Sequence, residues 1–122
     1  MRRLRIKIIV SLAAVLVASI SVACRSHGID VTIQNNASVP LRNVEVDYPG
    51  AAFGTGLIAP GASFWYHIKT ASTGDVTLSF EQPDGKMIRQ KQGSVHAGDS
   101  GRLIIIVEQD ANQKWHTRVE KK

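Results

Sequence analysis

Short runs of alternating apolar and polar residues dominate this chain from residue 30 onward, and they limit what it can fold into. An alternation of period two over about five to seven residues is typical of a β-strand that buries one face. After Cys24 no stretch keeps the i, i+3, i+4, i+7 spacing of an amphipathic helix, so we expect no substantial helix. The pattern predicts seven strands, at Asp30–Gln34, Asn43–Tyr48, Phe64–Ile68, Val76–Phe80, Lys86–Lys91, Leu103–Glu108 and Lys114–Val119.

Turn-forming residues separate these strands. The clearest hairpin signal is Asp84-Gly85, because this pair tolerates the positive φ angles of tight hairpin turns. Other connections are marked by Asn35-Asn36, Pro49-Gly50, Pro60-Gly61 and Asp110–Asn112. Seven short strands spaced in this way predict a single antiparallel β-sandwich or a small barrel.

The alternation also predicts the core, which should contain Val46, Phe64, Tyr66, Leu78, Phe80, Leu103, Ile105 and Val107. One strand departs from the pattern, because Leu103–Val107 is apolar on both faces and a sandwich strand normally buries only one. We expect the connection Pro49–Gly61, which carries three large apolar residues, to fold back over Ile104 and Ile106 and leave a monomer. The alternative is that these two isoleucines form an interface with a partner.

The N-terminal segment has the pattern of an export signal. Four basic residues lie within Met1–Lys7, and Ile8–Ile20 is an apolar run interrupted only by two serines. Small residues follow, and Cys24, the single cysteine of the chain, comes directly after Ala23. A basic start, a short apolar run and a small-residue exit are the marks of a secretory signal peptide.

The segment Ser21-Val22-Ala23-Cys24 resembles the lipobox of bacterial lipoproteins. The resemblance implies cleavage between Ala23 and Cys24 and attachment of acyl chains such as palmitate to a lipidated Cys24, which would anchor the protein to a membrane. Because Arg25 rather than Asp follows the cysteine, it also implies the periplasmic side of the outer membrane where one exists. Two alternatives remain: an ordinary signal-peptidase site at Ser21-x-Ala23, and an uncleaved anchor.

Removal of the signal changes the charge balance. The chain has 15 basic and 10 acidic residues, and four of the basic ones lie in the signal, which leaves 11 against 10. The high net charge therefore reflects targeting, and we expect no nucleic-acid partner. We divide the chain into a signal peptide at residues 1–23, the lipidated cysteine and a polar tether at 24–28, and one domain at 29–119.

By strand number, length and spacing, the segment Asp30–Val119 resembles immunoglobulin-like and fibronectin-III-like sandwiches of bacterial surface proteins. The cysteine pair of antibody domains is missing, because no cysteine follows Cys24. It also resembles small bacterial lipoproteins of unknown function. Folds of this kind carry many unrelated functions, so the resemblance implies a fold and no activity.

The usual chemical motifs are missing. The four histidines, His27, His67, His96 and His116, do not have the spacing of metal ligands, so we predict no metal and no cofactor. The loop Gly93–Gly101 gathers Ser94, His96, Asp99 and Ser100, but a catalytic triad is defined by geometry rather than by sequence proximity. We predict no catalytic residue and no enzyme.

One strand offers a candidate binding patch. If Phe64, Tyr66 and Ile68 face the core, then Trp65, His67 and Lys69 face outward on an open sheet. An exposed aromatic beside a histidine and a lysine has the composition of a binding surface. The interpretation we favour at this stage is that Trp65 is half-buried at the sheet edge, or in the core if the register is reversed.

The sequence leaves three classes of function open. The first is a non-enzymatic, membrane-anchored envelope lipoprotein that binds or supports another envelope component through its sandwich. The second is a secreted or periplasmic small-ligand-binding module, which requires a closed pocket with converging polar groups. The third is an enzyme, which requires titratable groups with perturbed pKa values in a cleft. We expect the first.

Overall fold

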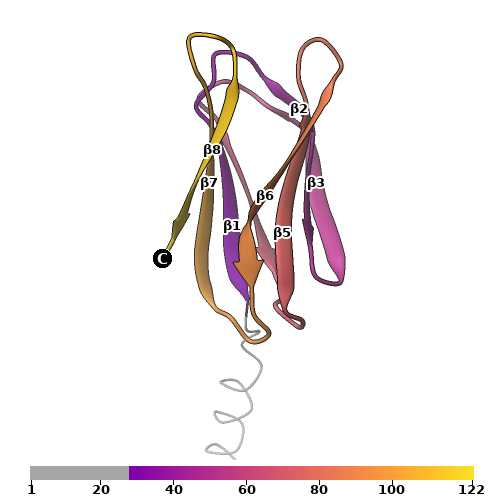
Figure 1. Cartoon of the computed structure of the whole chain (residues 1–122). Helices are drawn as coiled ribbons and strands as arrows, with labels where there is room; N and C mark the ends of the chain where they lie inside the picture. The colour runs from indigo at the N-terminus through magenta and orange to yellow at the C-terminus, as the bar shows by residue number, and fades with distance from the viewer. Residues whose placement is uncertain (1–27) are drawn as a thin grey trace, which may run out of the picture.

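The computed structural model describes residues 28–122, which form two four-stranded β-sheets packed face to face (Figure 1). All eight elements of this part are strands. In chain order they are β1 (Ile29–Asn35), β2 (Leu41–Tyr48), β3 (Ala51–Ile58), β4 (Ser63–Ile68), β5 (Gly74–Glu81), β6 (Met87–Val95), β7 (Gly101–Gln109) and β8 (Trp115–Lys121). The prediction of an all-β sandwich is confirmed, and each of the seven predicted strands overlaps an observed one.

The first sheet has the strand order β4-β1-β7-β8, and the second has the order β3-β2-β5-β6. All neighbours are antiparallel except β1 and β7, which run parallel in the middle of the first sheet. The prediction of a purely antiparallel, seven-stranded sandwich was therefore wrong in two respects: there are eight strands, and one pair is parallel.

The additional strand is β3, which lies within the segment predicted to be a long connection. Pro49 and Gly50 form a two-residue turn that pairs Tyr48 with Ala51, and Gly50 takes the positive φ of 91° that such a turn requires. Gly54 is needed on this strand, because a Cβ there would collide with the carbonyl oxygen of Val44. Glycines lower the strand propensity of β3, and this is why its sequence resembles a loop.

The placement of β3 also overturns the expectation that residues 49–61 cover Ile104 and Ile106. β3 belongs to the second sheet, whereas both isoleucines lie on the outer face of the first. Ile106 is nevertheless only 6% exposed, and Gln34 and Arg118 occupy the register positions on either side of it. Ile106 is therefore buried without the predicted loop, whereas Ile104 stays partly exposed.

The core lies between the sheets, and its largest fully buried side chains are apolar. Six of the eight predicted core residues are buried: Val46, Leu78, Phe80, Leu103, Ile105 and Val107. Phe64 is only partly buried, and Tyr66 is 47% exposed, so its assignment to the core was wrong. Both lie on β4, an edge strand that has a neighbour on one side only, and Tyr66 stacks on Phe53 with ring centroids 4.8 Å apart.

One buried polar side chain joins the connections at one end of the sandwich. The Asn35 Nδ2 group donates to the carbonyl oxygens of Val39, at 2.9 Å, and Ile58, at 3.0 Å. Its Oδ1 accepts the backbone N–H of Ala37 at 2.9 Å. Asn35 is completely buried, and its bonds to Ile58 and Ala37 satisfy backbone groups that water does not reach.

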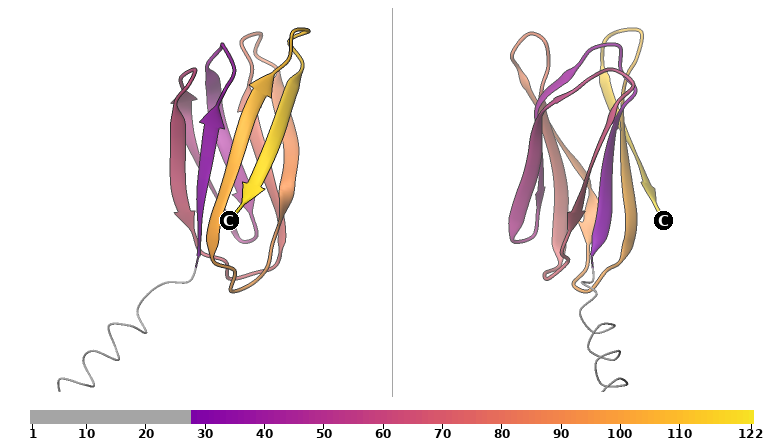
Figure 2. Two further views of the ribbon diagram at one scale, coloured as in Figure 1. Left: turned by 90° about the vertical axis from the view of Figure 1, so that its left-hand side faces the viewer. Right: turned by 180° about the vertical axis from the view of Figure 1, so that it is seen from behind.

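The two ends of the sandwich differ in what they carry (Figure 2). The first described residues enter at the end that also holds the turns after β2, β4 and β6. The opposite end, which we call the distal end, holds the connections after β1, β3, β5 and β7. The predicted Asp84-Gly85 hairpin tip lies there and is confirmed, with Gly85 at φ 86° and the Asp84 Oδ1 atom accepting the Lys86 N–H at 2.9 Å.

Candidate binding site

The outer face of the first sheet presents Trp65. Strand register places Thr32 of β1 beside Trp65 of β4 on one side and beside Ile104 of β7 on the other. The indole is 66% exposed, which makes Trp65 the most exposed large apolar residue of residues 28–122. The expectation that Trp65 is half-buried or in the core was therefore wrong, because the register directs it to solvent.

Charged groups lie in the next register row, one step along the same face. Asp30 pairs with His67 on β4 and with Arg102 on β7. The His67 Nδ1 atom lies 2.8 Å from the Asp30 Oδ1 atom, so the two side chains are paired at the surface. A shallow hollow of about 260 Å³ is lined by Asp30, Thr32, Trp65, Arg102 and Ile104. We call these five residues, together with His67, the Trp65 face.

Lys69 does not belong to this face. β4 ends at Ile68, and Lys69 instead lines a second hollow of about 380 Å³ at the end of the sandwich where β1 begins. Tyr48, Ala51, Tyr66 and His67 also line this hollow. The predicted patch of Trp65, His67 and Lys69 is thus divided between two neighbouring hollows, and His67 lines the second while contacting Asp30 of the first.

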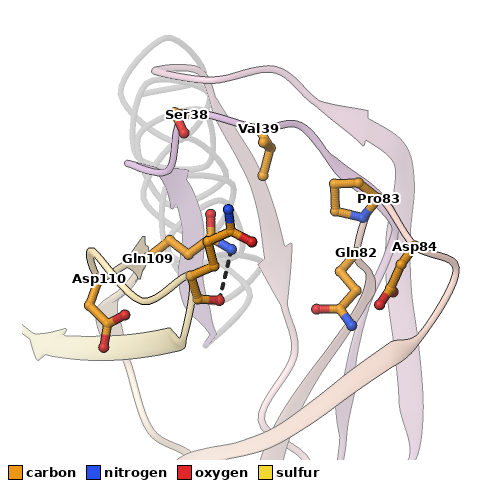
Figure 3. Close-up of a pocket in the computed structure, with 8 residues that line it drawn as sticks. Ser38, Val39, Gln82, Pro83, Asp84, Gln109 and Asp110 are labelled. Carbon is orange, nitrogen blue, oxygen red and sulfur yellow. Dashed lines mark hydrogen bonds between the residues drawn. The ribbon is translucent and has the colours of Figure 1, made fainter.

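A third hollow, at the distal end, has no counterpart in the sequence analysis. This cleft of about 420 Å³ lies between the connections after β1, β5 and β7 (Figure 3). The cleft is lined by Ser38, Val39, Gln82, Pro83, Asp84, Gln109, Asp110 and Gln113, so three glutamine amides and two carboxylates are among its polar groups. Two amides are held in place: the Gln82 Oε1 atom accepts the Trp115 indole N–H at 3.0 Å, and the Gln109 Nε2 group donates to the Gln113 carbonyl at 3.0 Å.

The polar loop Gly93–Gly101 stabilises a turn rather than assembling reactive groups. The Asp99 Oδ2 atom accepts the backbone N–H of His96 at 2.8 Å, whereas the Ser94 hydroxyl donates to Asp75 at 3.2 Å. Asp99 therefore serves as a turn cap, and Ser94 is bonded to a different carboxylate. No group of three or more His, Cys, Asp or Glu side chains within residues 28–122 is arranged to hold a metal ion.

Three surface carboxyls have pKa values below their ordinary range. A hydrogen bond from Lys91, together with its charge, lowers the pKa of Asp75. The backbone N–H of His96 lowers the pKa of Asp99, and the Asp110 pKa is lowered first by the hydrogen bond with His116 and then by the Lys114 N–H. Each cause is a local turn or cross-strand contact, and none of these carboxyls lies on the Trp65 face.

The predicted lipidation residue Cys24 and the cleavage site between Ala23 and Cys24 lie outside the described residues. In the part that is described, no helix is long and apolar enough to span a membrane.

Comparison with known proteins supports the fold and leaves the function open. No protein-family model matches the chain, and no curated protein does either. Among solved structures, the chain is similar to one described as the NMR structure of the protein from Eubacterium rectale, with a TM-score of 0.60 and 12% identity. The match covers 79% of this chain and 91% of that one, so the two share an overall fold.

Sequence reasoning missed Asp30 and Arg102 as members of the candidate site. The alternation places Asp30 on the same face as Thr32, which is a signal available in the sequence. The parallel pairing of β1 with β7 brings Arg102 beside Asp30 across more than half the chain, and no local pattern indicates that pairing.

Proposed function

We propose that this chain is a non-enzymatic, lipid-anchored protein of the bacterial cell envelope that binds another envelope component through the Trp65 face. The single observation that supports the proposal is the two-thirds exposed Trp65 on a sheet face whose next register row carries the hydrogen-bonded pair His67 and Asp30. Large aromatic residues and arginine are the side chains that most often dominate binding energy at protein interfaces.

The arrangement can provide both affinity and orientation. The Trp65 ring and Ile104 offer apolar area in one register row of the hollow, and Asp30 and Arg102 add opposite charges in the next row. An exposed indole keeps few rotatable bonds, so its ordering on binding costs little entropy. A partner with an apolar group and a neighbouring polar or charged group matches this surface.

The proposed anchor is the lipid on Cys24, attached after cleavage behind Ala23. Two acyl chains hold a protein stably at a membrane, because each buried methylene contributes about 0.8 kcal/mol. Only a few residues would separate Cys24 from the start of β1 at Ile29, so the domain would lie close to the membrane surface. We place it on the periplasmic side of the outer membrane where the source has one, and we propose that its sandwich is of the immunoglobulin or fibronectin-III kind.

Site-specific photo-crosslinking in growing cells tests the proposal. A photoreactive amino acid at position 65 should give a discrete crosslinked product with an envelope component. The same group at Met87 is the matched control, since Met87 is an exposed apolar residue on β6, an edge strand of the other sheet. Equal crosslinking from both positions, or none from position 65, would refute the proposed binding face.

A second function, that of a small-ligand-binding module, is favoured by the distal cleft. The amides of Gln82 and Gln109, each held by one hydrogen bond, line about 420 Å³ of space, which is within the size range of small-ligand sites. Under this alternative, Gln82→Ala abolishes ligand binding and Trp65→Ala does not.

A further inference from the structure

We propose that the outer edge of β3 is a docking site for an extended peptide, which adds as an antiparallel strand and places a carboxylate beside Lys69. This site adjoins the Trp65 face at His67, which also lines the hollow beside Lys69, and differs from that face in its mode of recognition.

The first observation is an asymmetry of charge between the edge strands. β3 and β4 form the two edges of one flank of the sandwich, where Phe53 of β3 stacks on Tyr66 of β4. Neither strand carries a lysine, arginine, aspartate or glutamate. On the opposite flank, β6 carries Arg89 and Lys91, and β8 carries Arg118, Glu120 and Lys121.

Charges, prolines and bulges are the devices by which proteins prevent strand addition at a free edge. β3 has none of them: its eight residues lack charge and proline, and its pairing with β2 is in continuous register. Within residues 28–122 β2 is its only strand partner, and apart from the Ile58 carbonyl, which accepts the Asn35 amide, the other edge of β3 offers unpaired backbone groups. Leu57 on this strand is 52% exposed, which adds apolar surface along the edge.

The second observation is the hollow that adjoins the start of β3. Ala51, the first residue of β3, lines the same hollow of about 380 Å³ as Tyr48, Tyr66 and Lys69. The hollow has no acidic lining residue, and among the described residues no carboxylate lies within ion-pair distance of Lys69. His67, which also lines the hollow, is bonded to Asp30, so this carboxylate already has a partner.

These two observations define the occupant. A strand that adds antiparallel to β3 has its C-terminal end at Ala51, because β3 begins there. That end enters a hollow with aromatic walls and an uncompensated lysine. Backbone hydrogen bonds along β3 would supply affinity, and the hollow would select a carboxylate, from either an acidic side chain or a free C-terminus.

Selection of linear octapeptides from a displayed random library on the immobilised full-length protein tests the inference. Enriched peptides should alternate β-forming side chains and carry an acidic group at the C-terminal end. Synthetic versions, measured by fluorescence anisotropy, should lose about tenfold or more in affinity when two alternate backbone nitrogens are methylated, because the edge bonds are then removed. Amidated and free-acid forms distinguish a side-chain carboxylate from a terminal one.

Protein variants separate this site from its neighbours. Lys69→Glu should weaken the acidic peptide about tenfold, whereas the matched Lys91→Glu on β6 and Trp65→Ala on the Trp65 face should leave its affinity unchanged. The N-methylated peptide alters only the ligand, so it tests edge pairing even if a variant fails to fold. No enrichment, binding that tolerates N-methylation, or a β3-mediated dimer that excludes the peptide would each overturn the proposal.

Discussion

Replacement of Asn35 by alanine tests how the distal end of the sandwich is held together. The change removes three hydrogen bonds at 2.9–3.0 Å and leaves the carbonyls of Val39 and Ile58 and the N–H of Ala37 without that partner. Each buried polar group left unpaired costs roughly 1–3 kcal/mol, and two of the three bonds are fully buried. We therefore expect Asn35→Ala to lower the free energy of unfolding by about 3 kcal/mol, out of roughly 5–15 kcal/mol for a domain.

Urea denaturation monitored by tryptophan fluorescence measures this effect, because Trp115 is buried and becomes exposed on unfolding. Asn36→Ala is the matched control: Asn36 is the next residue in the chain, is exposed, and accepts one surface hydrogen bond from Gln34. The control should change stability by less than about 0.5 kcal/mol. If the two variants unfold at the same urea concentration, the argument that Asn35 holds these connections is wrong.

Three further predictions follow from the core, the surface charges and the N-terminus. Phe80→Ala removes a fully buried ring that packs edge-on against Trp115, with ring centroids 4.9 Å apart. In the same urea assay it should lower the free energy of unfolding by about 3–5 kcal/mol, and a loss below about 1 kcal/mol would contradict the assigned core. Asp75, Asp99 and Asp110 have lowered pKa values in the folded state, so the stability they contribute is present above about pH 4 and is lost as the pH falls below it. The urea midpoint should therefore drop in acid, and Asp110→Asn should reduce that drop. Mass spectrometry of the native N-terminal peptide should find Cys24 carrying acyl chains, and an unmodified Cys24 would exclude the lipid anchor.

The strands could be predicted from the sequence where local alternation and the buried face coincide. β5 and β7 are the clearest cases, with Leu78, Phe80 and Ile105 in the core as expected. β3 could not be predicted because its glycines weaken the alternation, and it becomes a strand through its pairing with β2. Tyr66 shows a second limit: alternation predicts which face a side chain takes, but coverage of that face depends on neighbouring strands, and β4 has only one.

The candidate site was predictable in part for similar reasons. The period of a strand places Trp65 and His67 on the same face, which is a local property, but it does not decide that this face is the exposed one. The separation of Lys69 from them depends on where β4 ends, and strand ends are set by tertiary contacts. The contribution of Arg102 depends on a parallel pairing between distant segments, and the distal cleft depends on three connections meeting at one end.

The most direct test of the central claim is a quantitative affinity pull-down from detergent-solubilised envelopes with the full-length protein as bait. Trp65→Ala should reduce recovery of the specific partner at least about tenfold, as expected for loss of an aromatic hot spot, while Met87→Ala, a similarly exposed apolar position, should retain it. If Trp65→Ala recovers the same partner in the same amount as the unmodified protein, the Trp65 face is not the binding surface.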